Sequence, residues 1–86
     1  MQADQLRQTL AADPFRAFRI HFGSGRSVEV MNPGLVAVSE SGRIALAFKP
    51  HEDGHFVIDV MLIESLEVLP PGSNGSGPRN GSGEKE

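Results

Sequence analysis

The chain of 86 residues contains no cysteine, no tryptophan and no tyrosine. Without cysteine, disulfide bonds and thiolate metal sites are excluded. Proteins that read single-stranded RNA usually expose aromatic side chains on which the bases stack. The aromatic residues here are five phenylalanines, and those in the first predicted strand alternate with polar residues as core residues do. The composition therefore argues against recognition of RNA by base stacking.

Long apolar runs and an excess of basic residues are also missing. No run approaches the roughly 18 apolar residues of a membrane span, and the first residues lack the basic start and apolar segment of a signal peptide. We therefore expect a cytoplasmic protein that makes no contact with membranes. Eight Lys and Arg face eleven Asp and Glu, for a net charge of −3. A nucleic acid is a possible partner, but this charge does not favour it, because binding to phosphates usually needs a basic excess.

The hydrophobic pattern covers residues 1–69, which we interpret as a single small β-rich domain. Residues 70–86 contain no Val, Ile, Leu, Phe or Met and are rich in Gly, Ser, Pro and Asn, so a disordered tail is predicted there. A domain of about 70 residues has a modest core, and such domains often gain stability from a partner chain. With disulfides excluded, this raises the expectation of a homo-oligomer.

The most informative stretch reads as a short helix followed by a β-hairpin. Leu6 and Leu10 are i,i+4 neighbours in a predicted helix over residues 4–12, which ends before Pro14. Apolar and polar residues then alternate from Phe18 to Phe22, the pattern of a half-buried strand. A Gly-Ser-Gly turn and a second alternating segment follow. We expect the two leucines to dock on the Phe-rich strand.

Three further segments, over residues 35–39, 44–48 and 56–60, have the length and composition of strands. Residues 60–69 allow two interpretations. One helical turn near 60–63 with a strand through 69 fits best, and a short amphipathic helix is the alternative. The expected fold is mostly β (α+β), with an N-terminal helix and then a small five-stranded antiparallel sheet or an SH3/Sm-like open barrel.

One motif of catalytic proteins occurs in the sequence. Residues 51–55 spell His-Glu-Asp-Gly-His, which matches the H-E-x-x-H pattern of zinc metalloproteases. That chemistry needs both histidines on one face of a helix, and Pro50 and Gly54 break a helix here. None of the serines lies in a nucleophile elbow. We therefore predict a solvated loop, no catalytic residue, no metal site, no cofactor and no enzymatic activity.

Five basic side chains form the candidate interaction face. Arg19 and His21 share the polar face of the first strand, Arg16 precedes them, and two more arginines begin later strands. Such a row can contact phosphates or the carboxylates of a partner. The alternative is a solvated face that pairs with Glu29 across the hairpin. The candidate residues are Arg16, Arg19, His21, Arg26 and Arg43.

Several short motifs resemble those of a group of short bacterial proteins of unknown activity. They are Pro-Phe at 14–15, Phe-Arg-Ile-His at 18–21, Gly-Arg at 25–26, Ser-x-x-Gly-Arg at 39–43, Ile-Asp at 58–59 and Leu-Glu at 66–67. The resemblance spans residues 3–69 and implies no particular activity.

The order of the predicted elements is also similar to that of bacterial Sm-like RNA chaperones, which implies a ring-forming or edge-pairing module. Residues 37–42 resemble the Asp/Asn-x-Ser-x-x-Gly motif of PilZ domains, which bind cyclic di-GMP. Ala37 stands where that motif needs Asp or Asn, and Arg16 and Arg19 are one residue closer than its arginine pair.

These observations together predict a non-enzymatic interaction or self-assembly module that binds a protein partner or its own copies through strand edges and the face around Arg19. Sm-like RNA binding by the Arg/His strand face is the alternative function. PilZ-like nucleotide binding is a lesser one.

Overall fold

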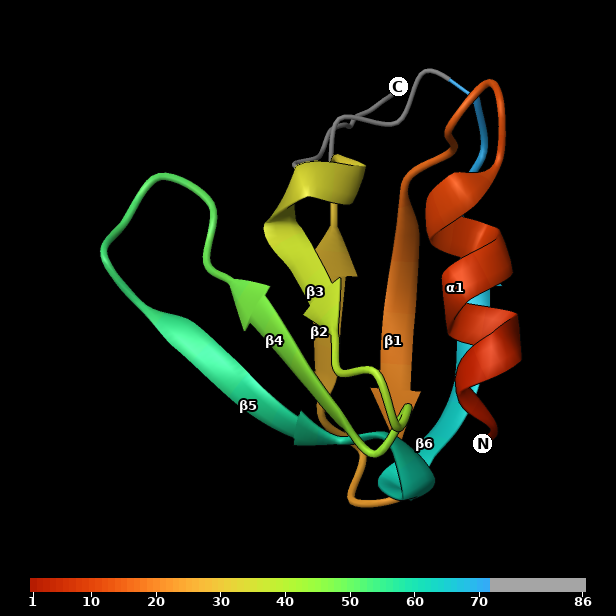
Figure 1. The fold of residues 1–86 in the computed structure, drawn as a ribbon. Helices are drawn as coiled ribbons and strands as arrows, with labels where there is room; N and C mark the ends of the chain where they lie inside the picture. The colour runs from red at the N-terminus through yellow and green to blue at the C-terminus, as the bar shows by residue number, and fades with distance from the viewer. Residues whose placement is uncertain (72–86) are drawn as a thin grey trace.

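The computed structural model describes residues 1–71 and contains one α-helix and two three-stranded antiparallel sheets (Figure 1). Nearly all of the predicted tail thus lies outside the described residues. Two short 3-10 turns, η1 and η2, connect strands of different sheets. The elements in chain order are α1 (Ala3–Ala11), β1 (Phe18–Phe22), β2 (Ser27–Val30), η1 (Pro33–Leu35), β3 (Val36–Val38), β4 (Ile44–Phe48), β5 (His55–Asp59), η2 (Val60–Leu62) and β6 (Ile63–Val68).

Helix α1 consists mostly of residues with high helix propensity, such as alanine, glutamine and leucine, and its leucines lie on one side. Leu6 is fully buried, and Leu10 packs partly buried against the same core. Asp4 lies in the first turn, where a negative charge suits the helix dipole. The helix ends before Asp13-Pro14, since the residue before proline is disfavoured in helical conformation. A nine-residue helix is marginal by itself, so burial of Leu6 holds it in place.

The first sheet has the strand order β2-β1-β6, with β1 in the centre. The hairpin register places Phe18 opposite Val30 and Ile20 opposite Val28. On its other side β1 pairs with β6, and the register shifts between His21 and Phe22. The turn between β1 and β2 closes with Gly25 at φ 91°, a conformation that glycine adopts without strain.

The second sheet has the order β3-β4-β5. Its central strand β4 is apolar on both faces, and the small residues are the buried ones: Ala45 and Ala47 are each 1% exposed. Leu46 on the opposite face pairs with Ala37 of β3 and Val57 of β5. Alanines on the inner face allow the two sheets and α1 to pack closely.

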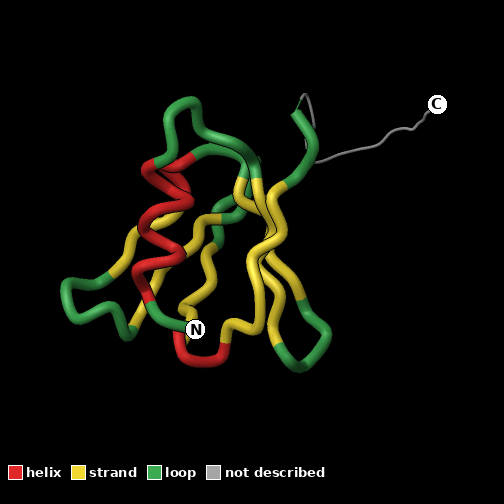
Figure 2. The backbone as a smooth tube through the Cα atoms, turned by 90° about the vertical axis from the view of Figure 1, so that its right-hand side faces the viewer, coloured by secondary structure: helices red, strands yellow, loops and turns green. Residues whose placement is uncertain are grey.

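The core lies between the sheets, with α1 covering one side. Figure 2 shows the helix in front of the strands when the molecule is turned by 90°. The edge-on contact of Phe15 with Phe18, with ring centroids 6.1 Å apart, extends the core toward the loop after the helix. The fully or nearly fully buried apolar residues are Leu6, Phe18, Ile20, Val30, Val36, Ala45, Ala47, Ile58, Val60, Ile63 and Leu69.

The predicted fold class, mostly β with an N-terminal helix, is confirmed. The six strands within residues 1–71 divide between two sheets, and the chain passes from one sheet to the other at η1 and again at η2. Asn32 stabilises that interruption, since its Oδ1 accepts from the Gly34 amide at 2.8 Å. Residues 60–69 form a 3-10 turn followed by a strand, as the preferred interpretation predicted. Within residues 1–71 no helix combines the length and apolar character that crossing a membrane requires.

Candidate interaction surface

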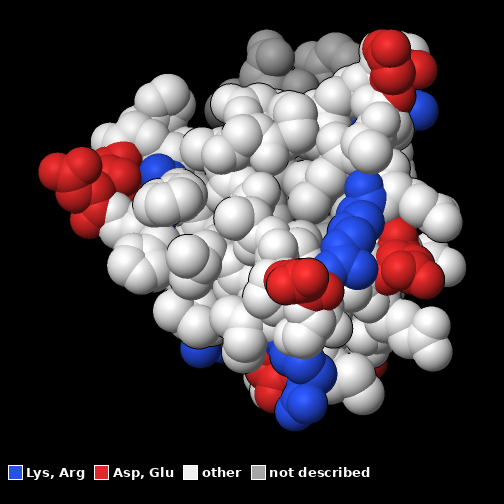
Figure 3. Space-filling model, viewed as in Figure 1, with Lys and Arg blue, Asp and Glu red and all other residues white. Residues whose placement is uncertain are grey.

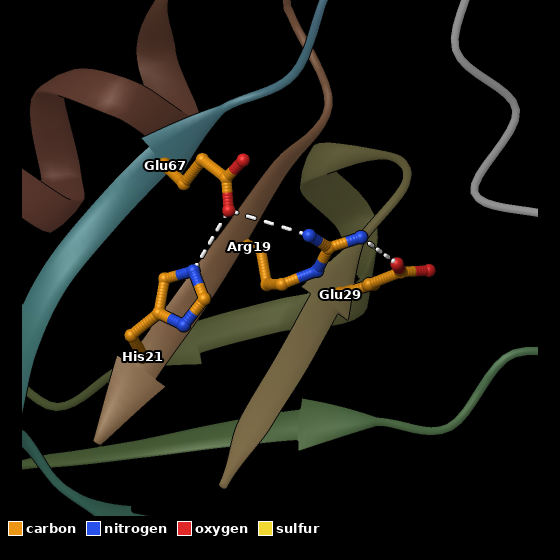
Figure 4. Close-up of polar contacts among 4 residues, drawn as sticks. All are labelled: Arg19, His21, Glu29 and Glu67. Carbon is orange, nitrogen blue, oxygen red and sulfur yellow. Dashed lines mark hydrogen bonds and ion pairs between the residues drawn. The ribbon is translucent and has the colours of Figure 1, made fainter. Parts of the chain in front are cut away.

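The polar face of β1 carries a four-residue network that joins all three strands of its sheet (Figure 4). Arg19 lies between two carboxylates, because the register puts Glu29 of β2 opposite it on one side and Glu67 of β6 on the other. Nη2 of Arg19 donates to Glu29 at 2.5 Å, and Nη1 donates to Glu67 at 3.3 Å. Nε2 of His21 lies 2.8 Å from the same Glu67 oxygen.

This network shifts the pKa values of two members. The hydrogen bond with Glu29 raises the pKa of Arg19 above its usual value, and the negative charges of Glu29 and Glu67 act in the same direction. The hydrogen bond from His21 is the largest cause that lowers the pKa of Glu67 below its ordinary value of 4.5, and the charge of Arg19 adds to it. Both shifts favour the charged forms, so Arg19 is neutralised by protein carboxylates near neutral pH.

The pairing of Arg19 with Glu29 across the hairpin, which was the alternative to an open basic face, is present in the structure. The contribution of Glu67 was missed, because its position opposite Arg19 depends on the pairing of β1 with β6, which are more than 40 residues apart in the chain. Alternation in the sequence identifies the polar face of each strand. It does not identify which distant strand lies beside it.

The other three candidate arginines do not join this network. Nη2 of Arg16 donates to the Leu69 carbonyl at 2.6 Å, which ties the segment before β1 to the end of β6. Arg26 is exposed in the β1–β2 turn, and Arg43 is exposed just before β4. Within residues 1–71, no carboxylate lies within ion-pair distance of these three arginines. The five candidate residues therefore do not form one basic surface.

The H-E-x-x-H segment lies in the loop between β4 and β5, not in a helix. His51 has a left-handed backbone conformation, with φ at 64°, and His55 is already the first residue of β5. No cluster of three His, Asp or Glu side chains suited to a metal ion occurs in the described part of the chain. The predicted solvated loop agrees with this placement.

A second surface, which the sequence analysis did not identify, is the outer face of sheet β3-β4-β5. Because the alanines of β4 face the core, Ile44 and Phe48 face outward, where they are 43% and 48% exposed. Val57 of β5 lies on the same face and is 66% exposed. In the view of Figure 3 a broad area over β4 and β5 carries no Lys, Arg, Asp or Glu. We call the side chains of Ile44, Leu46, Phe48 and Val57 the apolar outer face.

The sequence contains the signal for this face in an ambiguous form. The segment Ile-Ala-Leu-Ala-Phe at 44–48 is apolar at every position, so alternation alone does not say which side faces the core. The large residues would be placed inside by their size. In the structure the small residues Ala45 and Ala47 face the core instead, and the large residues of β4 face outward.

The apolar outer face continues to an unpaired strand edge. The hydrogen bond from the Lys49 amide to the Gly54 carbonyl shows that these two opposite residues are a hydrogen-bonded pair of β4 and β5. Two residues further along, Ala47 and Phe56 are therefore hydrogen-bonded to each other as well. Hydrogen-bonded and non-hydrogen-bonded pairs of residues alternate along two antiparallel strands. The N–H and C=O groups of residues 55, 57 and 59 thus point away from β4, and no other strand within residues 1–71 pairs with them.

A cleft of about 500 Å³ lies beside this edge. Four consecutive residues of β5, 56–59, line one side, and residues of the β1–β2 turn, among them Arg26, line another. Leu62 of η2, 66% exposed, also lines the cleft. The edge of β5 therefore faces open space bordered by apolar and polar side chains.

Comparisons with protein-family models, with curated proteins and with solved structures gave no match. The arrangement of side chains within the chain is accordingly the basis for a functional proposal.

Proposed function

We propose that this protein is a non-enzymatic interaction module that associates with other protein chains, its own copies included, through sheet β3-β4-β5. The main support is the apolar outer face, where Ile44, Phe48 and Val57 are 43–66% exposed beside an unpaired strand edge. Monomeric soluble proteins rarely expose large contiguous apolar patches, and such patches mark interaction sites. An unpaired edge is in addition a template for another strand.

The small core supports the same proposal. Within residues 1–71 eleven apolar residues form it, two of them alanines of β4, and a domain of this size buries a modest part of its surface. Association would bury the apolar side chains that the single chain leaves in water. The location in the cytoplasm stays a prediction from the sequence.

A direct test compares two surface variants by analytical ultracentrifugation over a wide concentration range. Val57→Thr removes an apolar group from the apolar outer face at the free edge, where Val57 is 66% exposed, and Val68→Thr is the matched control, since Val68 is 50% exposed on a strand of the other sheet. We expect Val57→Thr to weaken association and Val68→Thr to leave it unchanged. A wild-type chain that is monomeric at every concentration and retains no other protein in pull-downs would refute the proposal.

Sm-like RNA binding through the Arg/His strand face has weaker support. It needs Arg19 and His21 to reach phosphates, and both are engaged by Glu67. It predicts salt-sensitive retention of RNA that is lost in Arg16→Ala and Arg19→Ala. We expect no retention even at low salt. Retention that depends on these two arginines would make RNA binding the better proposal.

PilZ-like nucleotide binding is supported less still, because Arg16 is committed to the Leu69 carbonyl and Arg19 to two carboxylates.

A further inference from the structure

We propose that the partner of β5 is β5 of a second copy of this chain, in an antiparallel pair centred on Val57. This inference rests on the proposed function and specifies its partner and its register. The two strands would join the sheets of two copies into one six-stranded sheet. The apolar outer faces of both copies would then be continuous across the new pair.

The residues of β5 whose N–H and C=O groups are free select this register. The groups free to bond at the edge belong to residues 55, 57 and 59, so a new antiparallel strand must place such residues opposite one another. Centring on Val57 pairs all five residues of β5, and any other permitted register pairs fewer. Val57 of each copy then forms a hydrogen-bonded pair with Val57 of the other, and the interface is two-fold symmetric.

The side chains on the outer face of β5 are self-complementary in this register. His55 of each copy comes to lie opposite Asp59 of the other, on the face where Val57 is exposed. The imidazole offers an N–H donor, and the Asp59 carboxylate, whose Oδ1 accepts from the Met61 amide in its own chain, has a second oxygen to accept it. Both side chains are exposed in the single chain, and the symmetry makes the contact twice. Opposite-charge or hydrogen-bonding pairs directly across strands stabilise a sheet.

The edges of β6 and β3 offer less to a second copy. On β6 the free edge groups belong to Leu66 and Val68, and the register that pairs these two residues places Glu67 opposite Glu67 of the other copy. Like charges directly opposite each other destabilise a strand pair. The edge of β3 is only three residues long, and α1 contacts this strand. The edge of β5 is open, since the cleft runs beside it.

The absence of cysteine allows a register-specific test by disulfide capture. In the proposed dimer the Cα atoms of the two Val57 residues are about 5.5 Å apart, within the range that a disulfide spans. Val57→Cys should therefore form a disulfide-linked dimer rapidly under mild oxidation. His55→Cys is the matched control on the same exposed face, because the two His55 residues would be about 13 Å apart, which is four residues of strand.

A charge test uses the same position. His55→Asp places two carboxylates opposite each other at both ends of the pair, and we expect it to weaken dimerisation at least about tenfold. His55→Gln keeps a hydrogen-bond donor and should change the dimerisation constant much less. Both variants alter an exposed side chain and remove its ring contact with Phe48 alike, so the comparison between them reports on the added carboxylate.

The outcomes separate the inference from the proposed function. Fast capture of Val57→Cys with no capture of His55→Cys, together with slower hydrogen exchange of the Val57 amide at high wild-type concentration, supports the β5 pair. Equal capture of both variants, or a wild-type oligomer in which neither is captured, overturns the β5 pair and leaves self-association in place. A wild-type chain that is monomeric at every concentration overturns the β5 pair alone, and one that in addition retains no other protein in pull-downs overturns the proposed function as well.

Discussion

The orientation of β4 decides whether an apolar outer face exists, and two adjacent residues of that strand test it. Phe48 is 48% exposed and Ala47 is 1% exposed. Full burial of a phenylalanine stabilises a protein by about 1.5–3 kcal/mol, so truncation of a half-exposed one should cost roughly 1 kcal/mol. Ala47→Leu adds methylene groups to a packed interior and should cost about 1–3 kcal/mol. The larger loss is thus expected from the residue that is smaller in the wild-type chain.

Urea unfolding of Phe48→Ala and Ala47→Leu measures these losses, at protein concentrations where each chain is monomeric. An unchanged dependence on denaturant would show that the two variants unfold from the same kind of native state. A loss of about 3–5 kcal/mol for Phe48→Ala is the value for a core phenylalanine. Such a loss, with Ala47→Leu near neutral, would mean that β4 faces the other way and that the apolar outer face does not exist.

Three further predictions concern the rest of the fold. Leu6→Ala should lower the free energy of unfolding by about 2–5 kcal/mol, because Leu6 is fully buried. A loss below about 1 kcal/mol would show that α1 is not docked on the sheets. Gly42→Ala should cost about 1–3 kcal/mol, because Gly42 has φ +78° and a Cβ there would lie 2.7 Å from that of Ala3. Gly23→Ala, which meets nothing within 4 Å, is the control, and equal losses would contradict the packing of α1 on this turn. The pKa of Glu67 should lie below 4.5 in an NMR titration. A carboxyl whose pKa is lower in the folded protein stabilises the fold at pH values above its ordinary pKa. This stabilisation should be lost as the pH falls through the folded-state pKa, and Glu67→Gln should abolish that pH dependence. A Glu67 carboxyl that titrates at 4.5 or higher would contradict the network.

The sequence was sufficient for the local structure. Alternation from Phe18 to Phe22, the proline after the helix and the turn glycines are short-range signals, and each corresponds to an element of the structure. The helical turn before β6 was also predictable, because the apolar run at 60–63 gives way to alternation. Here Asp59 caps the turn, as its Oδ1 accepts from the Met61 amide at 3.0 Å.

The sequence was insufficient where contacts join distant segments. Glu67 reaches Arg19 only because β6 pairs with β1, and no local pattern encodes that pairing. The outward direction of Phe48 depends on how closely the alanines of β4 approach the core. The Arg/His strand face predicted as the interaction face has a central arginine that is neutralised by two carboxylates. The candidate surface in the structure is instead the apolar outer face with the edge of β5.

Self-association of the unmodified chain tests the proposed function most directly. Sedimentation equilibrium from micromolar to millimolar concentration should give a mass that rises with concentration from that of one chain toward that of two. Val57→Thr should shift the rise to higher concentration, and Val68→Thr should follow the wild type. A constant mass of one chain over the whole range, with no other protein bound, would contradict the account.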